Sequence, residues 1–213
     1  NTDDSVIDNL GNLTVNGCTF VNNNLCEKLI GSYGNLTIVE SEFYDNVLSA
    51  YLIYVASSGN LIVNESTFEN NTVDNVGNLI SIDFANSAKI ISNEFVDNMV
   101  SGNIISVNLC NDALINSVFA NNTQGNNVIS ADRNSNLLVE NSVFTNNELS
   151  NIIFSTNNNQ TISGCTFVDN TVENVVYSED NNLSVLGSTF TANTLSGNGA
   201  LNIQSNVSAT VDG

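Results

Sequence analysis

The chain has no proline, histidine or tryptophan, and only three of its 213 residues are basic, Lys28, Lys89 and Arg133. Without histidine it cannot build a Ser-His-Asp triad, a Cys-His dyad or a zinc site that uses imidazole. Three cations against 22 acidic residues give a net charge of −19, which leaves no basic surface for nucleic acid or for an anionic membrane. No run of about 20 apolar residues is present, so no membrane-spanning helix is predicted.

Asparagine, in contrast, is abundant, with 43 copies in the chain. Hydrophobic residues make up 41% of the sequence, which is enough for a core. They recur at regular intervals, and this favours a folded chain over a disordered acidic one.

The strongest pattern is a Phe-x-x-Asn motif that occurs eight times at a period of about 24 residues. The phenylalanines of the motif are Phe20, Phe43, Phe68, Phe95, Phe119, Phe144, Phe167 and Phe190. The asparagines are Asn23, Asn46, Asn71, Asn98, Asn122, Asn147, Asn170 and Asn193. Eight of the ten phenylalanines share this register, so the motif is a repeat and not a by-product of the high asparagine content.

The residues around each motif align as well. An aliphatic residue stands five positions before each Phe, and these equivalent positions are expected to stack in one register: Val15, Ile38, Val63, Ile90, Leu114, Val139, Ile162 and Val185. A small residue stands two positions before it, namely Cys18, Ser41, Ser66, Asn93, Ser117, Ser142, Cys165 and Ser188. A further apolar pair, such as Ile80 and Ile82, follows some eight to twelve residues after Phe. Alternation with a period of two predicts strands, and the Asn, Gly, Ser and Asp residues between them predict turns.

Three short strands in each repeat of about 24 residues predict an all-β fold, a right-handed single-stranded parallel β-helix of about eight coils. Stacked coils about 4.8 Å apart give a rod of roughly 40 Å. Equivalent positions then form ladders: an internal phenylalanine stack, and an asparagine ladder at a bend. The absence of proline fits strands that all need their backbone N–H groups.

The repeated Phe-x-x-Asn units resemble those of adhesin-like surface proteins of methanogenic archaea, and are similar to the repeats of chlamydial polymorphic outer-membrane proteins. The Asn-rich, Pro-free segments "NLTVNGCTFVNNN" and "NLIVNESTFENNTV" carry the archaeal resemblance. It implies an exported, extracellular cell-surface protein. Residues 1–213 are predicted to form one domain. Because Val6 and Val211 match strands of further coils, this domain is expected to be either a section of a longer repeat array or a stacking subunit.

Catalytic and metal-binding sites are not predicted. Parallel β-helices include polysaccharide-active enzymes, so this class is kept as an alternative. The three basic residues, however, share no register, and the closest acidic pairs, such as Glu40 and Glu42, do not recur on adjacent coils. Asp45, Asp97 and Asp169 are read as a solvated turn ladder, and no calcium-binding loop motif is present. No cofactor is expected.

Exposed aromatic residues are the candidate partner contacts, since aromatic side chains suit glycan stacking or protein contact. The candidates are Tyr33, Tyr44 and Tyr54. Tyr44 follows the inward Phe43 and is therefore expected to point outward. Packing against neighbouring loops is the alternative explanation for these side chains.

Eight Asn-x-Ser/Thr sequons are candidate glycosylation sites: Asn12, Asn35, Asn64, Asn70, Asn121, Asn159, Asn182 and Asn206. With 43 Asn and about a fifth Ser plus Thr, chance gives about the same number. Cys18 and Cys165 occupy the register of the small inward residues, so we expect them to fill space in the core. A disulfide between Cys18 and Cys26 is the alternative, and the state of Cys110 is left open.

The function predicted from the sequence is adhesion or scaffolding at the cell surface by a rigid, non-enzymatic rod. Its partner would be a protein or a glycan on another cell or on the same surface. The alternative is an extracellular filament whose subunits stack end to end, and a polysaccharide-active enzyme is a third possibility. Neither nucleic acid nor direct membrane insertion is expected.

Overall fold

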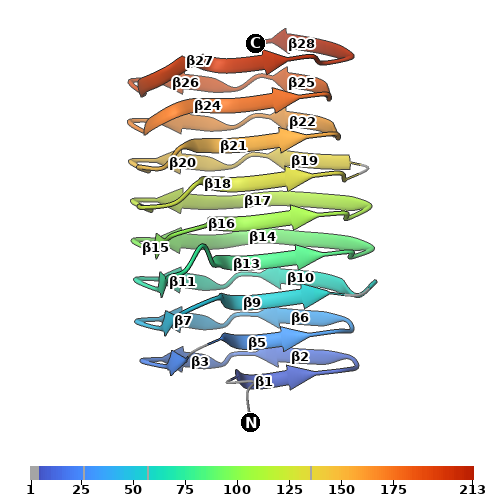
Figure 1. Cartoon of the computed structure of the whole chain (residues 1–213), viewed down its shortest axis with the longest axis vertical. Helices are drawn as coiled ribbons and strands as arrows, with labels where there is room; N and C mark the ends of the chain where they lie inside the picture. Colours follow the sequence, from blue (N-terminus) through green and yellow to red (C-terminus); the bar gives the residue numbers. More distant parts are fainter. Residues whose placement is uncertain (1–4, 26, 57, 135) are drawn as a thin grey trace.

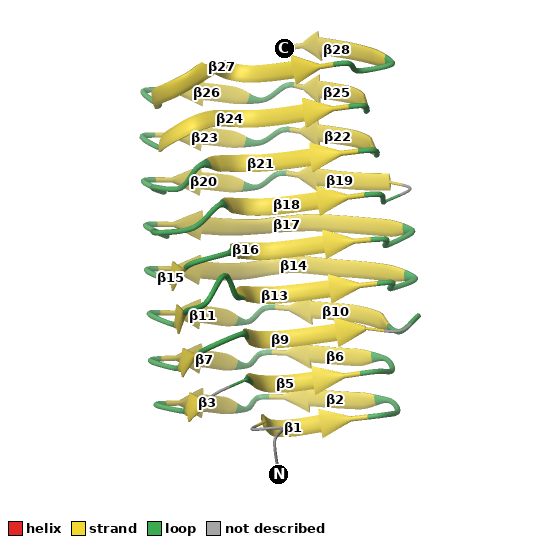
Figure 2. Ribbon diagram, viewed as in Figure 1, coloured by secondary structure: helices red, strands yellow, loops and turns green. Residues whose placement is uncertain are grey.

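The computed structural model describes residues 5–25, 27–56, 58–134 and 136–213, and this part of the chain is all strands and loops (Figure 2). Each coil runs through successive strands, and every strand pairing joins equivalent strands of adjacent coils in parallel. In Figure 1 the nearer strands point right and the fainter ones point left as the chain climbs, which is a right-handed winding. The predicted parallel β-helix is therefore confirmed, with about 24 residues per turn.

Three parallel sheets form the walls of the solenoid. The nine-stranded sheet contains β1 (Ser5–Asn9), β5 (Lys28–Ser32), β9 (Tyr51–Ala56), β13 (Asn78–Asp83), β16 (Asn103–Asn108), β18 (Asn127–Asp132), β21 (Asn151–Thr156), β24 (Thr171–Glu179) and β27 (Thr194–Gln204). The four-stranded sheet contains β4 (Asn24–Leu25), β8 (Val47–Leu48), β12 (Thr72–Val73) and β15 (Met99–Val100). The short strands of this second sheet were not predicted, although their apolar residues follow each Phe at a fixed distance.

The fifteen-stranded sheet holds the two strands that flank the bend before each Phe. Its first set is β2 (Leu13–Asn16), β6 (Leu36–Val39), β10 (Asn60–Asn64), β14 (Ser87–Val96), β17 (Asp112–Ala120), β19 (Asn136–Glu140), β22 (Asn159–Ser163), β25 (Asn182–Leu186) and β28 (Ser208–Asp212). The Phe-containing strands are β3 (Thr19–Val21), β7 (Glu42–Tyr44), β11 (Thr67–Glu69), β20 (Val143–Thr145), β23 (Thr166–Val168) and β26 (Thr189–Thr191). In β14 and β17 both parts are continuous.

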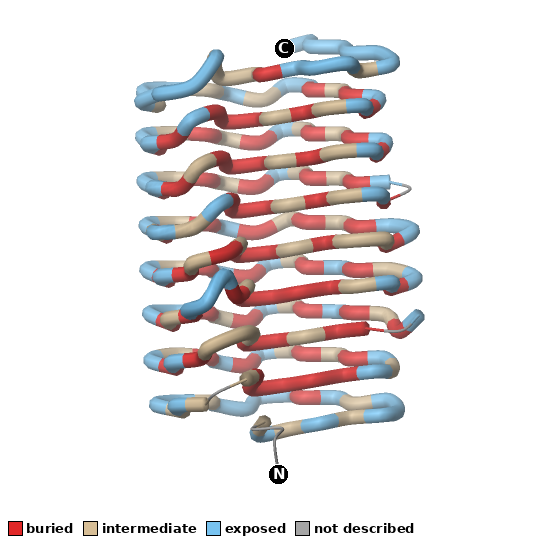
Figure 3. The backbone as a smooth tube through the Cα atoms, in the orientation of Figure 1, coloured by how far each residue is buried: buried red, intermediate tan, exposed pale blue. Residues whose placement is uncertain are grey.

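The core lies between these sheets, and its largest side chains form one aromatic column. The eight motif phenylalanines stack from coil to coil, with ring centroids 4.7 to 5.0 Å apart and interplanar angles of 2 to 12°. The six from Phe43 to Phe167 are fully buried, whereas Phe20 and Phe190 are partly buried. Buried residues recur at the same places in successive coils (Figure 3).

The motif asparagines line the bend that follows each Phe. In each step the Asn amide Nδ2 donates to Oδ1 of the Asn in the next coil, over 2.8 to 3.0 Å. From the second coil onward, Nδ2 also donates to the carbonyl of the Phe in the preceding coil, for example from Asn122 to Phe95 at 2.9 Å. The ladder therefore satisfies buried polar groups that the turn removes from the sheets.

One register prediction is wrong. Leu114 does not point inward, because β17 is one residue shorter before its Phe than the neighbouring coils. Ala113 and Ile115 pair with Leu137 and Val139 and are buried, whereas Leu114 lies on the outer side and is partly exposed. Its neighbour β14 has an extra residue, Ser92, in the left-handed region at φ 57°, and β17 has no counterpart of it.

Candidate functional site

The outer side of the nine-stranded sheet carries the aromatic residues that the structure brings together. Tyr54 on β9 packs against Tyr51 with ring centroids 5.1 Å apart, and against Tyr33 with an edge-to-face geometry at 6.3 Å. We call Tyr33, Tyr51 and Tyr54 the tyrosine cluster. Tyr33 is 39% exposed and the other two are partly exposed, so the cluster is an accessible surface and not part of the core.

A lysine lies beside the cluster, where Lys28 pairs with Tyr51 in the strand register. Lys28 opens β5 and is only 7% exposed, with its ammonium 3.7 Å from Asp8 Oδ1 and 3.5 Å from Glu27 Oε2. Its stem crosses Gly31, where a Cβ would collide with the Lys28 side chain and with Asp8. Gly31 pairs directly with Tyr54, and its missing side chain therefore leaves room for a cation beside the tyrosines.

The surroundings of Lys28 and Tyr54 shift the pKa of both groups. Burial alone would lower the pKa of the Lys28 ammonium, but Asp8, Tyr33 and Glu27 together hold that pKa above its ordinary value of 10.5. Burial, followed by the charge of Asp83, raises the pKa of the Tyr54 phenol above 10.0. The surface thus presents the neutral phenol of Tyr54 next to a paired lysine.

A second aromatic group lies further along the same sheet. Phe154 on β21 and Tyr177 on β24 stack at 4.9 Å with an interplanar angle of 10°, and we call them the aromatic pair. The Tyr177 hydroxyl donates to Glu179 Oε2 over 3.0 Å, and this bond orients the ring. Burial and the neighbouring Glu179 raise the pKa of Tyr177, so it is neutral at physiological pH.

Strand register places both groups in one outward line. The residues that pair in succession along the sheet are Tyr54, Ser81, Ser106, Ser130, Phe154 and Tyr177. Four inter-strand steps separate Tyr54 from Phe154, which at about 4.8 Å per step is about 19 Å. We call this line the outer column.

An asparagine ladder borders the outer column. Nδ2 of each Asn donates to Oδ1 of the Asn in the preceding coil over 2.9 to 3.0 Å, through Asn78, Asn103, Asn127, Asn151 and Asn174. The sequence analysis did not identify this ladder or the aromatic pair. Both recur at the period of the Phe motif, so aligning the strand that follows the bend would have revealed them.

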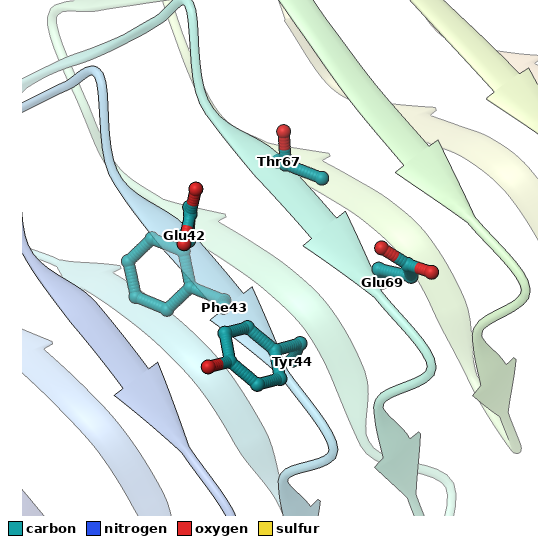
Figure 4. A pocket seen from close by; sticks show the side chains of 5 residues that line it. All are labelled: Glu42, Phe43, Tyr44, Thr67 and Glu69. Atoms are coloured by element: carbon teal, nitrogen blue, oxygen red, sulfur yellow. The ribbon is translucent and has the colours of Figure 1, made fainter.

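The third candidate tyrosine, Tyr44, lies elsewhere. It is on β7 of the fifteen-stranded sheet, where it borders a shallow depression with Glu42, Thr67 and Glu69 (Figure 4). The side chain is partly exposed, and the adjacent Phe43 is fully buried. Tyr44 is therefore separated from the tyrosine cluster and provides a matched control for it.

The candidate glycosylation sites differ in what their amides do. Asn12, Asn35, Asn70, Asn121, Asn159 and Asn182 are exposed, whereas Asn64 and Asn206 are partly buried. Nδ2, the atom that a glycan would occupy, donates from Asn35 to Asn12, from Asn159 to Asn136 and from Asn182 to Asn159. A glycan attached to Asn35, Asn159 or Asn182 would therefore disrupt the hydrogen bond that this residue donates.

The acidic residues are divided between strands and turns. Asp45, Asp97 and Asp169 all occupy left-handed turn positions, with φ of 55 to 56°. Glu40 stands at the bend with φ 49°, next to the strand that contains Glu42. Within the described ranges, no three His, Cys, Asp or Glu side chains are grouped as a metal site. Nor does that part of the chain contain a helix long and apolar enough to cross a bilayer.

The thiols differ in exposure. Cys110 and Cys165 are buried, and burial raises the pKa of both, that of Cys110 to about 11. Cys18 is exposed at the first coil, so the expectation that it fills space in the core is wrong, and Cys26, the partner in the alternative disulfide, lies outside the described residues. Cys165 is in the small-residue register at the bend, where its backbone N–H donates to Ser188 Oγ.

We expect Cys18 to react much faster with iodoacetamide at mildly alkaline pH than Cys110 or Cys165, because only its thiol is accessible. In a Cys26→Ser chain, native alkylation followed by mass spectrometry should label one site quickly, and denaturant should release the other two. Equal native labelling of all three thiols would contradict the burial.

The free energy of unfolding should fall as the pH rises from 9.0 to about 11, because the Cys110 thiol ionises at lower pH in the unfolded chain than in the folded one. Cys110→Ala should reduce this loss of stability.

Comparison with known proteins does not assign a family. No family model matches the chain, and no curated protein is significantly similar in sequence. One solved structure it resembles is HetL, a pentapeptide repeat protein involved in heterocyst differentiation regulation from the cyanobacterium Nostoc. The identity is 10%, the match covers 93% of this chain and 87% of that one, and the TM-score is 0.27. The fold assignment accordingly rests on the strand pairings of this chain itself.

Proposed function

We propose that this chain is a non-enzymatic recognition rod at the cell surface that binds a partner through the tyrosine cluster. The proposal rests on one observation: Tyr33, Tyr51 and Tyr54 lie together on one outward surface. Aromatic side chains that remain accessible on a rigid support are typical of binding sites, because little conformational entropy is lost when they are covered.

The scaffold supports this proposal. The phenylalanine stack and the asparagine ladders hold each coil in register with the next, so the outer side chains keep fixed spacings along the rod. The buried Lys28, which pairs with Tyr51 in the strand register, is itself held by Asp8 and Glu27. A location outside the cell is part of the proposal and comes from the repeat resemblance.

The test compares two variants of the purified chain for binding to isolated prokaryotic cell envelopes. We expect Tyr33→Ser/Tyr51→Ser/Tyr54→Ser to lose at least about tenfold in affinity, the equivalent of about 1.4 kcal/mol. Tyr44→Ser removes a tyrosine from the other sheet and should bind like the wild type. Circular dichroism and thermal melting establish that both variants are folded. Wild-type binding by the folded triple variant, or no binding by any chain, would reject the proposal.

A further inference from the structure

We propose that the partner is a neutral linear polysaccharide that lies along the outer column, between the tyrosine cluster and the aromatic pair. This inference rests on the proposed function and specifies the chemistry of the same surface. The nine-stranded sheet would then bind its partner through two aromatic platforms, the tyrosine cluster and the aromatic pair, and not through the tyrosine cluster alone.

The spacing of the aromatic groups points to an extended ligand. Tyr54 and Phe154 share one column and lie about 19 Å apart, with Ser81, Ser106 and Ser130 between them. Ser106 and Ser130 place small, partly exposed hydroxyl side chains along the path, whereas the Ser81 side chain is only 4% exposed. A single sugar cannot contact both platforms, whereas a chain of several sugars can.

The chemistry of the column matches a sugar chain. The apolar C–H face of a pyranose packs on an aromatic ring, and its hydroxyls need hydrogen-bond donors and acceptors beside that ring. Ser106 and Ser130 are partly exposed in the column, and so is Asn103 beside it; Asn127 and Asn151 are buried and use their amides in the ladder. Platforms and polar groups are thus arranged along one line.

The negative charge of the chain favours a neutral polysaccharide over an acidic one. The outer column carries no charged side chain from Tyr54 to Tyr177, but Asp83, Asp132 and Glu179 stand at the ends of the same strands. The two basic residues of this sheet region are already paired, Lys28 with Asp8 and Glu27, and Arg133 with Asp132 at 2.7 Å. With a net charge of −19, an acidic polysaccharide would be repelled, and a neutral one would not.

Affinity electrophoresis tests the inference directly. The purified chain is run through gels that contain a neutral β-glucan, mannan or galactan, and through gels that contain the acidic polymers pectate or alginate. We expect retardation by at least one neutral polymer and by neither acidic one. Retardation by the acidic polymers alone, or by none of the panel, would overturn the inference.

Variants then locate the site and test its length. The triple change Tyr33→Ser/Tyr51→Ser/Tyr54→Ser and the double change Phe154→Ser/Tyr177→Ser should each weaken binding of the long polymer about tenfold, because each removes one platform. Tyr44→Ser should leave it unchanged. Short oligosaccharides should bind more weakly than the polymer and should be insensitive to loss of one of the two platforms. Equal affinity for short and long chains, or no effect of the double change, would contradict a two-platform site.

Envelope treatment separates this inference from the proposed function. If periodate oxidation of the envelopes abolishes binding and protease treatment does not, the polysaccharide partner is supported. If protease treatment abolishes binding and periodate does not, the partner is a protein, so the proposed recognition function stands while the polysaccharide inference fails.

Discussion

Replacing Phe119 with alanine is expected to lower the free energy of unfolding by about 3–5 kcal/mol. Its ring is fully buried and stacks on Phe95 and Phe144 at 4.9 and 5.0 Å. Because the coils above and below are joined by continuous strand pairing, the walls cannot collapse into the space that the ring leaves, and a cavity remains. Chemical denaturation followed by circular dichroism measures the change.

Phe84→Ala is the matched control for this experiment. Phe84 is one of the two phenylalanines outside the repeat register, and its side chain is 60% exposed after β13. Its removal should change stability by less than about 0.5 kcal/mol. Similar losses for the two variants would mean that the phenylalanine stack does not carry the stability assigned to it.

Replacing Gln160 with leucine is expected to raise the free energy of unfolding by about 2–4 kcal/mol. Gln160 is inward on β22, between Leu137 and Leu183 of the adjacent coils, and is only 1% exposed. Neither Oε1 nor Nε2 has a hydrogen-bond partner among the described residues. Leucine has a similar volume, removes two unsatisfied polar atoms and restores the apolar column.

The reciprocal change Leu137→Gln is the control. It places an amide at the equivalent position one coil earlier, where Leu137 is buried, and should destabilise the chain. The measurement is again the denaturation midpoint. A destabilising effect of Gln160→Leu would show that the amide has a stabilising partner, such as an ordered water, and would reject this account.

The fold was predictable because the ladder residues are large or chemically specific. Phenylalanine recurs at a nearly fixed interval, and a stacked coil is the arrangement that buries all of these rings together. The Leu114 error arose in the same argument. Counting back from Phe119 assumed a constant strand length, but the bulge residue that is Ser92 in the preceding coil is missing in β17. A one-residue deletion reverses which side chains face inward.

The candidate site was less predictable for a different reason. Tyr33 and Tyr54 were candidates because they are aromatic residues in an acidic sequence, but the sequence does not show that they contact each other and Tyr51. Phe154 and Tyr177 lie on adjacent coils and meet only through strand register. Sequence spacing shows such pairs only once each strand of the coil has been aligned.

The pairing between coils also determines how the rod would respond to force. The hydrogen bonds between strands run along the rod axis, from one coil to the next, so a pull applied through the two ends of the chain loads one interface at a time. Coils would peel off in sequence, and each coil of about 24 residues would release roughly 80 Å of extended chain. A rod of this kind would yield by gradual lengthening under tension, and the coils that have not yet peeled would keep their strand pairings.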